Sequence, residues 1–532
     1  MGLRVACVGG GPGGLFLASL LKAADASSDV VVIERNAPHD TFGFGVVFSD
    51  ATLGGLDDAD PLFIQSLRAH CEHWDAIHVR VRGQEFAFGG NGMAAITRVT
   101  LLGLLYERAQ ELGVDMRFGT EVHDLGLLDE FDVVVACDGA NSWYRHCFVD
   151  DFGLTVDVAS AKFIWLGTTY PFEGLTFVHV RNADGVFAVH GYPIGDGVGT
   201  FIVETDEDSW ARAGLDGFDV SQPPGPSDLD SVAYLERLFA AELGGHRLLA
   251  NNSRWGNFRT IRNRTWRRDN LVLLGDAAHT AHFSVGSGTK MAMEDAIALA
   301  GALAEHPTDI PSALDAYETA RRPSVDRIQN ASRPSLSWWE QFGSYHDALD
   351  PEQFAFHFFS RSIGHAALAR RDPGFIEAIE EWWRRQNGAD PQHSPLTIGS
   401  VTLPERVVSV DLPRDDQPGS IDCGDIRVPL LQAWTPAPSA STWAAYVEAP
   451  LDDHDLQAAT ERAKGAIEAG ASLVAAGGGT RLARVRLSEE VRMAMKVPSL
   501  VIEDDADEDL AVTYLLSGRA DLFGVQGGIS GA

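Results

Sequence analysis

Three glycines near the start of the chain have the spacing needed to hold a pyrophosphate. Gly9, Gly11 and Gly14 follow a short apolar run and open a stretch with helical periodicity from Leu15 to Leu21. Glycines permit a tight turn, and they let backbone amides approach a phosphate whose charge is favoured at a helix N-terminus. The segment therefore predicts a dinucleotide-binding turn, with a glycine-rich turn without a ligand as the alternative.

An acidic residue lies where a ribose ligand is expected. Glu34 ends a second apolar run about 20 residues after Gly14, and Arg35 follows it. Strand, helix and second strand together form a βαβ opening, in which the acid accepts hydrogen bonds from ribose hydroxyls. We predict that Glu34 and Arg35 contact the dinucleotide, although this segment alone does not separate FAD from NAD.

Two later segments carry acids, glycines and an arginine at fixed spacing. The first, VVVACDGANSWYRHCF, has a DGxxSxxR pattern, and the second is LVLLGDAAHTAHFSVGSGTKMAMEDA. The patterned residues are Asp138, Gly139, Ser142 and Arg145 in the first segment, and Gly275, Asp276, His279, Gly286, Gly288 and Asp295 in the second.

In their order and spacing, these segments resemble the class A flavoprotein monooxygenases. The resemblance implies that Asp138 and Gly139 serve both FAD and NAD(P)H, and that Asp276 meets the ribityl chain of the flavin. It further implies that Gly286 and Gly288 belong to the same cofactor site. The expected cofactor is bound FAD, with NAD(P)H and O2 as cosubstrates.

One further match and two departures refine this resemblance. Arg98, in ITRVTLLGLLYERAQELG, matches the helix-opening arginine that contacts FAD in the family, with a solvated helix start as the alternative. After GDAAH the family has a proline pair where this chain has His282 and Phe283, and the last residue of the GxGxN pattern is Lys290. Because that loop borders the flavin ring in the family, its altered chemistry indicates a subgroup.

The segments ERNAPHDTFGFGVVFSD, HWDAIHV, FIWLGT and FIVET are similar to those of the salicylyl-CoA 5-hydroxylases. They are also similar to the monooxygenase half of anthraniloyl-CoA monooxygenase and, more distantly, to violacein-pathway hydroxylases. The resemblance implies hydroxylation of an aromatic CoA thioester, with 5-hydroxylation of salicylyl-CoA to gentisyl-CoA as the leading reaction. The open alternatives are anthraniloyl-CoA, a CoA-free indole or aryl metabolite, and a non-catalytic flavoprotein that mediates assembly.

Five residues are candidates for catalysis or ring binding. His282 and Ser284 lie in the atypical loop, where a histidine can act as a general base because its pKa is tunable near neutrality. Hydrogen-bonded packing is an equally open interpretation. Phe48 ends the GFGVVF turn, which we expect to line the flavin and substrate. His190 and Tyr192 share one strand face in FAVHGY, where both substrate contact and solvent exposure remain open.

An arginine-rich stretch stands out in an otherwise acidic chain. Arg262 and Arg264 are candidates for the phosphates of CoA, because planar guanidinium groups suit phosphate geometry. Pairing with nearby acids on a solvated loop is the alternative. The HCEH segment offers no further ligands, so we expect no metal. The arginine cluster comprises Arg254, Arg259, Arg262, Arg264, Arg267 and Arg268.

Short strand patterns between about residues 155 and 261 interrupt the dinucleotide-binding pattern, which returns at LVLLGDAAH. We therefore predict an α/β fold with a Rossmann-type FAD-binding domain, an inserted mixed β-sheet substrate domain, a helical extension and a small α/β C-terminal unit. The Pro-containing stretch GADPQHSP marks a boundary. The predicted domains are residues 1–390 and 395–532.

The C-terminal segments SPLTIGSVTLPERVVSV and AIEAGASLVAAGG resemble strands of old-yellow-enzyme barrels. An eight-stranded βα barrel needs about 250 residues, and only about 135 follow the boundary. We predict a truncated barrel that lacks its middle and has no second flavin site. Hydroxylation without ring reduction is then expected.

Composition excludes several other classes. The formal net charge of -33 opposes binding to nucleic acid or anionic membranes. Five scattered cysteines without a CxxC pair argue against a disulfide framework and fit a reducing compartment. The glycine-rich N-terminus differs from a signal peptide, and no run reaches the length of a membrane span. We expect a cytoplasmic enzyme whose aromatic-rich helices allow a homodimer.

Overall fold

The structure is a computed structural model of the chain. Its residues form two compact units: Met1–Arg80 with Gly90–Glu340, and Val81–Gly89 with Gln341–Ala532. Among the residues that it describes, no helix is both long and apolar enough to cross a membrane. The described residues are 2–38, 40–41, 43–219, 225–286, 288–414, 417–434, 441–453 and 455–527.

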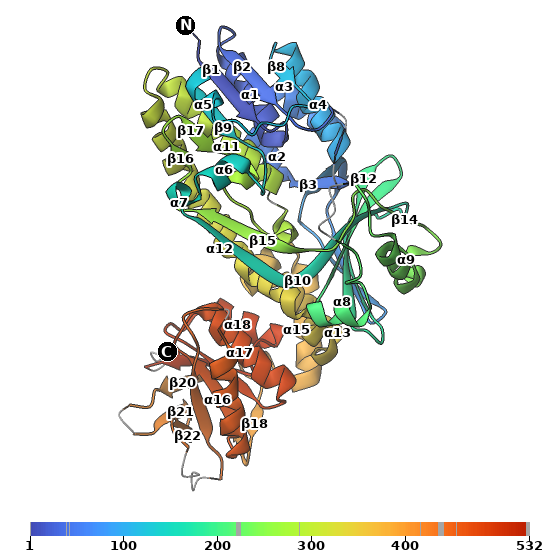
Figure 1. Cartoon of the computed structure of the whole chain (residues 1–532). Coiled ribbons are helices and arrows are strands. Elements are labelled where there is room, and N and C mark those ends of the chain that lie inside the picture. The colour runs from blue at the N-terminus through green and yellow to red at the C-terminus, as the bar shows by residue number, and fades with distance from the viewer. Residues whose placement is uncertain are drawn as a thin grey trace. The chain divides into compact units, whose positions relative to one another are not determined.

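A largely parallel sheet forms the centre of the cofactor-binding part of the first unit (Figure 1). Its strand order is β16-β17-β9-β1-β2-β8, and only β16 runs antiparallel to its neighbour. The central strands are short runs of buried Val, Ile and Ala, as expected where both faces of a sheet are covered. The strands are β1 (Arg4–Val8), β2 (Asp29–Ile33), β8 (Asp115–Arg117), β9 (Val133–Ala136), β16 (Arg267–Arg268) and β17 (Leu271–Leu273).

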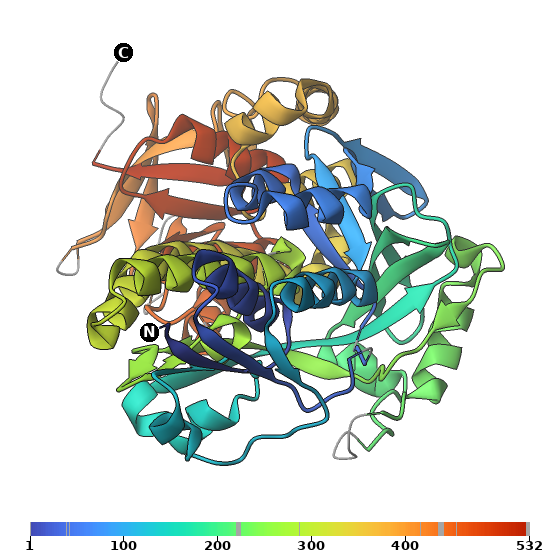
Figure 2. The same ribbon diagram turned by 90° about the horizontal axis from the view of Figure 1, so that it is seen from above.

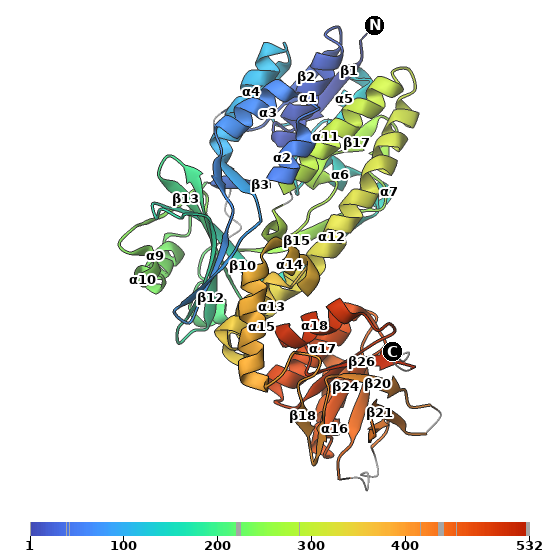
Figure 3. The ribbon, with the colours of Figure 1, turned by 180° about the vertical axis from the view of Figure 1, so that it is seen from behind.

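Three helices line one side of this sheet. Helix α1 (Pro12–Ala24) lies between α4 (Arg98–Glu111) and α11 (Gly288–Glu305), as the views in Figures 2 and 3 show. The apolar residues of α1 from Leu15 to Leu17 are buried against the sheet core. This packing fixes the position of the turn that joins β1 to α1.

A small antiparallel sheet adjoins the same unit, with β7 (Met93–Thr97) between β3 (Gly45–Ser49) and β4 (Glu72–Trp74). β7 leads directly into α4, so this sheet determines where α4 begins. Helices α2 (Asp50–Leu56) and α3 (Pro61–Ala69) follow β3.

A second large sheet is inserted between β9 and β17. Its order in the first unit is β14-β10-β13-β12-β11-β5, and β15 pairs with the N-terminal part of β10. The insertion confirms the predicted α/β fold with an interrupting mixed sheet. Its strands are β5 (Ile77–Val81), β10 (Leu154–Thr168), β11 (Leu175–Arg181), β12 (Val186–Gly195), β13 (Val198–Thr205), β14 (Leu248–Leu249) and β15 (Gly256–Asn263).

One face of this inserted sheet forms an apolar core with three short helices. Phe187, Val189 and Val203 point to a core that also holds Leu235 and Phe239. Leu235 lies in α9, and Phe239 directly follows the end of that helix. The covering helices are α8 (Glu207–Arg212), α9 (Leu229–Leu238) and α10 (Ala240–Leu243).

In the second unit, strands β20 to β26 close into a barrel. β20, β21 and β22 pair antiparallel, the later neighbours pair parallel, and β26 returns to pair with β20. The antiparallel β21–β22 hairpin therefore completes a ring that a full βα barrel would close with further βα units. The strands are β20 (Val407–Asp411), β21 (Gly419–Cys423), β22 (Ile426–Leu431), β23 (Ala444–Glu448), β24 (Leu473–Gly477), β25 (Ser499–Glu503) and β26 (Leu522–Gln526).

Helical residues after Glu340 belong to this second unit. The sequence placed them with the first domain, whereas the structure packs α13 and α14 against α18. The predicted domains, residues 1–390 and 395–532, stay predictions. The helices of this unit are α13 (Pro351–Phe359), α14 (His365–Arg371), α15 (Pro373–Asn387), α16 (Gln457–Glu468), α17 (Arg481–Glu489) and α18 (Glu508–Ser517), and α12 (Ile310–Ala348) leads into it.

A buried carboxylate joins these helices to the barrel. Glu489 Oε1 accepts a hydrogen bond from His357 Nε2 at 3.0 Å, and Oε2 accepts one from Tyr345 Oη at 2.7 Å. Arg519 lies 3.7 Å from the same carboxylate and donates to the carbonyl oxygen of His357. Burial and the charge of Arg519 lower the pKa of His357 to about 4, so this imidazole is neutral near pH 7.

Acidification should therefore weaken the second unit through His357. Its folded pKa lies below the ordinary value of 6.5, so its contribution is present above that value and is lost as the pH falls. Between about pH 7 and pH 5 we expect a loss of about 2 kcal/mol in the free energy of unfolding. His357→Gln should remove this pH dependence. The measurement is the urea concentration at which a protease begins to cleave the full chain within the second unit, at each pH.

The matched control is His393→Gln, because the His393 side chain is 65% exposed in the same unit. This control should keep the pH dependence of the wild type. Equal pH dependence in the wild type and in His357→Gln would contradict the prediction.

Candidate active site

The turn between β1 and α1 is packed too closely for side chains at two positions. A Cβ at Gly9, whose φ is +121°, would lie 2.2 Å from the carbonyl oxygen of Cys137. A Cβ at Gly14 would lie 2.2 Å from the carbonyl oxygen of Gly9. At Gly11, by contrast, no atom of the described residues lies within 4 Å of an added Cβ. The N-terminus of α1 therefore opens at Gly11 and fits a pyrophosphate.

Glu34 flanks this turn at the end of β2. Its Oε2 accepts a hydrogen bond from the Gly10 N–H at 2.7 Å, and its Oε1 accepts one from the Asn36 N–H at 2.8 Å. The carboxylate is thereby held beside the turn, where the sequence expects a ribose. Arg35 points to the surface and lies 3.9 Å from Glu121, both side chains being more than half exposed. Cofactor contacts of Glu34 and Arg35 stay predictions.

The second motif follows β9 and forms a tight acidic turn. Asp138 Oδ2 accepts a hydrogen bond from the Trp143 N–H at 2.8 Å, and Gly139 adopts a φ of +82°. Ser142 caps the short helix α6 (Trp143–Cys147). Burial raises the pKa of Asp138, and its Oδ1 has no hydrogen-bond partner among the described residues. A buried oxygen of this kind is available to a ligand hydroxyl.

Arg145 connects the second motif to the third. Its side chain is 1% exposed, and Nη1 donates to the carbonyl oxygen of Ala277 at 2.8 Å. The side chain of the neighbouring Asp276 is exposed to solvent, but protein atoms lie around its carboxylate and partly desolvate it. Burial raises the pKa of Asp276, and the charges of His279 and Arg98 oppose that rise. A ligand site is concave and carries a few polar groups that the ligand can reach, and the carboxylate of Asp276 is such a group.

Arg98 meets three parts of the first unit at one point. Its backbone N–H donates to the carbonyl oxygen of Phe44 at 2.8 Å, and its guanidinium carbon lies 5.9 Å from the ring centre of Trp165. Burial lowers the pKa of Arg98, opposed by interactions with Tyr192 and Asp276. Arg98 therefore joins the start of α4 to the inserted sheet and to the third motif, as a cofactor-contacting residue requires.

The third motif ends in a loop that folds back on the inserted sheet. His282 is 2% exposed, and its Nδ1 lies 2.7 Å from Ser284 Oγ. Ser284 Oγ in turn lies 2.9 Å from Ser335 Oγ on α12. Gly286 ends the short helix that contains Ser284 with a φ of +61°, and Gly288 begins α11. The predicted pair His282 and Ser284 is thus brought into direct contact.

One face of the inserted sheet carries aromatic and ionisable side chains. His190 and Tyr192 on β12 are 3% and 5% exposed, so both are buried. The register places Phe177 opposite His190, and the ring centre of His190 lies 4.2 Å from that of Trp339 and 5.5 Å from that of Phe283. This face is therefore walled by rings and turned toward the loop of His282.

Glu204, at the centre of this face, was missed by the sequence interpretation. Its Oε1 lies 2.9 Å from His190 Nε2 and 3.9 Å from His282 Nε2. The signal that could have found it is an acid within the apolar strand TFIVET, at the parity of inward-facing positions.

Three other predicted residues lie elsewhere. Phe48 is 1% exposed and packs in the hydrophobic core of the first unit. Arg262 lies 3.5 Å from Asp157, and Arg264 donates to the carbonyl oxygen of Asp151 at 3.2 Å. Only Arg262 of these two is thus paired with a carboxylate among the described residues, and the contact of both arginines with CoA stays a prediction.

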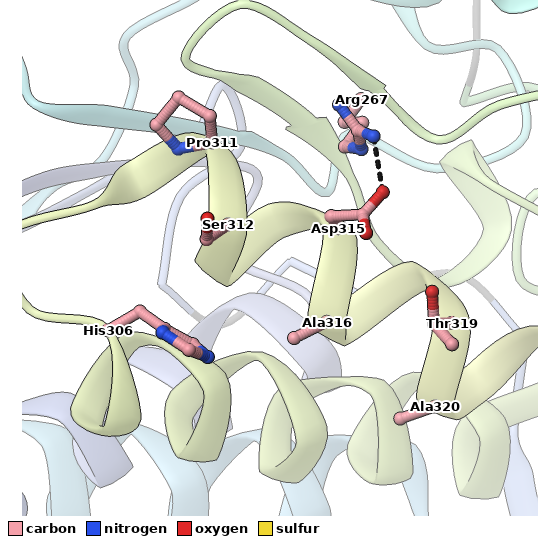
Figure 4. Close-up of a pocket in the computed structure, with 8 residues that line it drawn as sticks. All are labelled: Arg267, His306, Pro311, Ser312, Asp315, Ala316, Thr319 and Ala320. Atoms are coloured by element: carbon pink, nitrogen blue, oxygen red, sulfur yellow. Dashed lines mark hydrogen bonds and ion pairs between the residues drawn. The ribbon is translucent and has the colours of Figure 1, made fainter.

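A hollow of about 720 Å³ lies away from all of these residues (Figure 4). The end of α11, the start of α12 and Arg267 line it, and Arg267 pairs with Asp315 across it. Because the wide opening leaves this hollow exposed to solvent and none of the three motifs reaches it, the chemistry is better placed at the motifs.

The cofactor turn, the third motif and the ring-lined face together define a flavoprotein site. The family model described as "FAD binding domain" matches residues 3–127 and 130–332. The chain therefore belongs to this family, and it is an FAD-dependent aromatic monooxygenase that uses NAD(P)H and O2.

Among individual relatives, a salicyloyl-CoA 5-hydroxylase from Streptomyces sp is 54% identical over 523 residues, which cover 98% of this chain and 99% of that protein. The 3-hydroxy-4-methyl-anthranilyl-[aryl-carrier protein] 5-monooxygenase of Streptosporangium sibiricum is 38% identical, over 63% of this chain and 89% of that protein. The solved tetrameric form of 2-methyl-3-hydroxypyridine-5-carboxylic acid oxygenase has the same fold, with a TM-score of 0.50 at 21% identity, over 64% of this chain and 93% of that chain.

The packing at Gly14 makes a direct prediction about the cofactor. In Gly14→Ala the added Cβ would meet backbone and the Cys137 sulfur at 2.8 Å, so the turn must move. We expect at least about a tenfold loss of FAD affinity, measured by flavin absorbance of the folded protein after dialysis. The control is Gly54→Ala, because no described atom lies within 4 Å of the added Cβ in α2. Full FAD retention in a folded Gly14→Ala protein would contradict the prediction.

Proposed function

We propose that this chain hydroxylates the ring of an aromatic acyl-CoA, with salicylyl-CoA converted to gentisyl-CoA as the leading reaction. The observation that carries the proposal is the 54% identity to a salicyloyl-CoA 5-hydroxylase, which extends through both units. The buried, ring-walled face beside the cofactor motifs supports it, because an aromatic substrate needs apolar walls and few polar groups.

The chain supplies position and protection from water. Bound FAD, with electrons from NAD(P)H, supplies one oxygen atom of O2 in electrophilic form, and the other atom leaves as water. Phe283, Trp165 and Trp339 enclose the sheet face and exclude solvent from the reacting ring. We assign the removal of the ring hydroxyl proton to a pair of imidazoles, in which His190 accepts the proton and His282, oriented by Ser284, contacts the hydroxyl.

Removing the hydroxyl proton directs the chemistry. A phenolate oxygen donates electron density to the ring more strongly than a hydroxyl does, and the position para to it is then the most nucleophilic open carbon. That position corresponds to 5-hydroxylation of salicylyl-CoA. His190 and Tyr192 line the same face and are proposed ring contacts.

A substrate panel tests this proposal. We expect oxygen-dependent NAD(P)H oxidation with salicylyl-CoA, slower oxidation with anthraniloyl-CoA and little with the corresponding free acids. The measurement is NAD(P)H absorbance, with the hydroxylated product identified by mass spectrometry. Oxidation driven by free acids or indoles but not by thioesters would support the CoA-free alternative. Bound FAD without any substrate-dependent oxidation would support the assembly role.

Arg262 and Arg264 are the proposed contacts for the CoA phosphates. Replacing both by Gln should raise the KM for salicylyl-CoA by about tenfold and leave kcat nearly unchanged, because a remote handle contributes uniform binding. The matched control replaces the exposed Arg237 and Arg247 by Gln, which removes the same charge. An unchanged KM in the Arg262→Gln, Arg264→Gln protein would reject this CoA site.

The homodimer and the cytoplasmic location are proposals of the same kind. The aromatic-rich helical sequence allows a homodimer, and sedimentation of the FAD-loaded protein tests it.

A further inference from the structure

Glu204 is a carboxylate that is buried on the inserted sheet, where charged side chains are rare. Glu204 lies near the end of β13, where the register places it opposite Phe163 on β10 and Ala188 on β12. Its side chain is 1% exposed. Because a carboxylate loses its hydration on burial, an ionised side chain at this position requires compensating partners.

Two imidazoles approach the same oxygen of this carboxylate. Glu204 Oε1 lies 2.9 Å from His190 Nε2 and 3.9 Å from His282 Nε2, and these side chains are 4% and 2% exposed. One carboxylate and one imidazolium are together neutral, whereas a second imidazolium would be an unmatched buried charge. The three groups, here called the Glu204 triad, can therefore take up one proton beyond the state in which Glu204 is ionised and both imidazoles are neutral.

The loop decides which imidazole takes that proton. The Ser284 N–H donates to His282 Nδ1 at 3.4 Å, and a backbone amide can only donate. This contact favours the tautomer in which Nδ1 of His282 is unprotonated and the ring proton is on Nε2, toward Glu204. His190 is left to take the additional proton, and the nearby ring of Trp339 stabilises a positive charge there.

Other titratable or charged groups face this part of the sheet, among them His179, Tyr192 and Arg98. His179 lies on the same face of β11, with Nδ1 3.3 Å from the carbonyl oxygen of Arg80. Burial raises the pKa of Tyr192 to about 12, so its hydroxyl stays neutral near pH 7. Arg98 is matched by the charge of Asp276. The charge of Glu204 therefore acts on the two histidines of the triad and on whatever binds beside them.

We infer that Glu204 determines which ring substituents the site accepts. Its negative charge lets His190 take the proton of a ring hydroxyl, and the same charge opposes a carboxylate bound next to that hydroxyl. A thioester carbonyl is neutral, so the site accepts an acyl-CoA and disfavours the free aromatic acid. The inference rests on the proposed function and gives Glu204 a positioning and specificity-determining role.

The proton step balances within the triad. The O–H bond of the ring hydroxyl breaks, its electron pair stays on the oxygen, and the proton forms an N–H bond on His190. Glu204 offsets the imidazolium charge, and His282 keeps its proton on the side of Glu204. No electron is gained or lost, so the step needs no oxidant.

Salicylamide and salicylate test this inference, because they share the ring and ortho hydroxyl and differ in the charge of the neighbouring group. We expect the FAD-loaded wild type to bind salicylamide at least about tenfold more tightly than salicylate, and Glu204→Gln to lower this ratio at least about tenfold. Flavin absorbance on titration measures both affinities. Fluorescence of the bound phenolate against pH measures the proton step, and Glu204→Gln should raise the pH at which bound salicylamide ionises.

Two further variants keep the test decisive. Glu207→Gln removes the same charge from an exposed residue of α8, which is 63% exposed and pairs with Lys162, and it should leave the ratio unchanged. Glu204→Asp keeps the charge and should keep the preference for salicylamide, which separates the effect of the charge from that of a changed side chain at this position. A folded, FAD-loaded Glu204→Gln protein with the wild-type ratio would overturn the inference, as would loss of the preference in Glu204→Asp.

The outcomes also separate this inference from the proposed function. A wild-type enzyme that prefers salicylamide but does not oxidise NAD(P)H with salicylyl-CoA would overturn the proposed function and support the charge argument. A wild-type enzyme that hydroxylates salicylyl-CoA but binds salicylate and salicylamide equally would overturn the inference alone.

Discussion

The buried carboxylate of Asp295 holds the flavin motif in the position on which the rest of the site depends. It accepts hydrogen bonds from the Gly275 N–H at 3.1 Å and from His279 Nε2 at 2.8 Å, and Arg321 Nε donates to it at 2.8 Å. Burial would raise the pKa of Asp295, but the charges of His279 and Arg321 lower it, so it stays ionised. The turn that carries Asp276 is thereby tied to α11 and α12.

A second set of hydrogen bonds carries that restraint to the inserted sheet. Gln329 on α12 donates to the carbonyl oxygens of Ile261 at 2.9 Å and Thr280 at 2.8 Å. Thr280 Oγ1 accepts from the Ile261 N–H and donates to the carbonyl oxygen of Arg259. The strand β15, the loop and α12 are therefore fixed together, and His282 comes to lie against the histidine and acid of the sheet. Hydrogen bonds between these side chains and backbone groups thus set the geometry of the ring site.

The cofactor motifs could be predicted from the sequence because their chemistry is local. Gly9 and Gly14 satisfy steric limits within one turn, and their spacing alone reports them. His190 and Tyr192 were different, because strand alternation shows that they share a face but not which face is inward. The apolar core under α9 and α10 takes the opposite face, and that depends on long-range packing. The role of Glu204 depends on its contacts with His190 and His282, which lie on other elements of the fold.

The C-terminal barrel is closed although it has fewer strands than the eight of a full βα barrel. The carrier-protein monooxygenase matches 63% of this chain and 89% of its own length, so it is a shorter protein than this one. Pairing of β26 with β20 leaves no open edge, which makes the barrel stable as a structure. In βα barrels a phosphate often binds beside the last two strands, but here β25 ends at Glu503, and Asp504 and Asp505 follow it. Arg484 pairs with Glu503 at 2.7 Å, and the remaining acids oppose a flavin phosphate. These charges favour a barrel retained for structure over one that holds a second flavin.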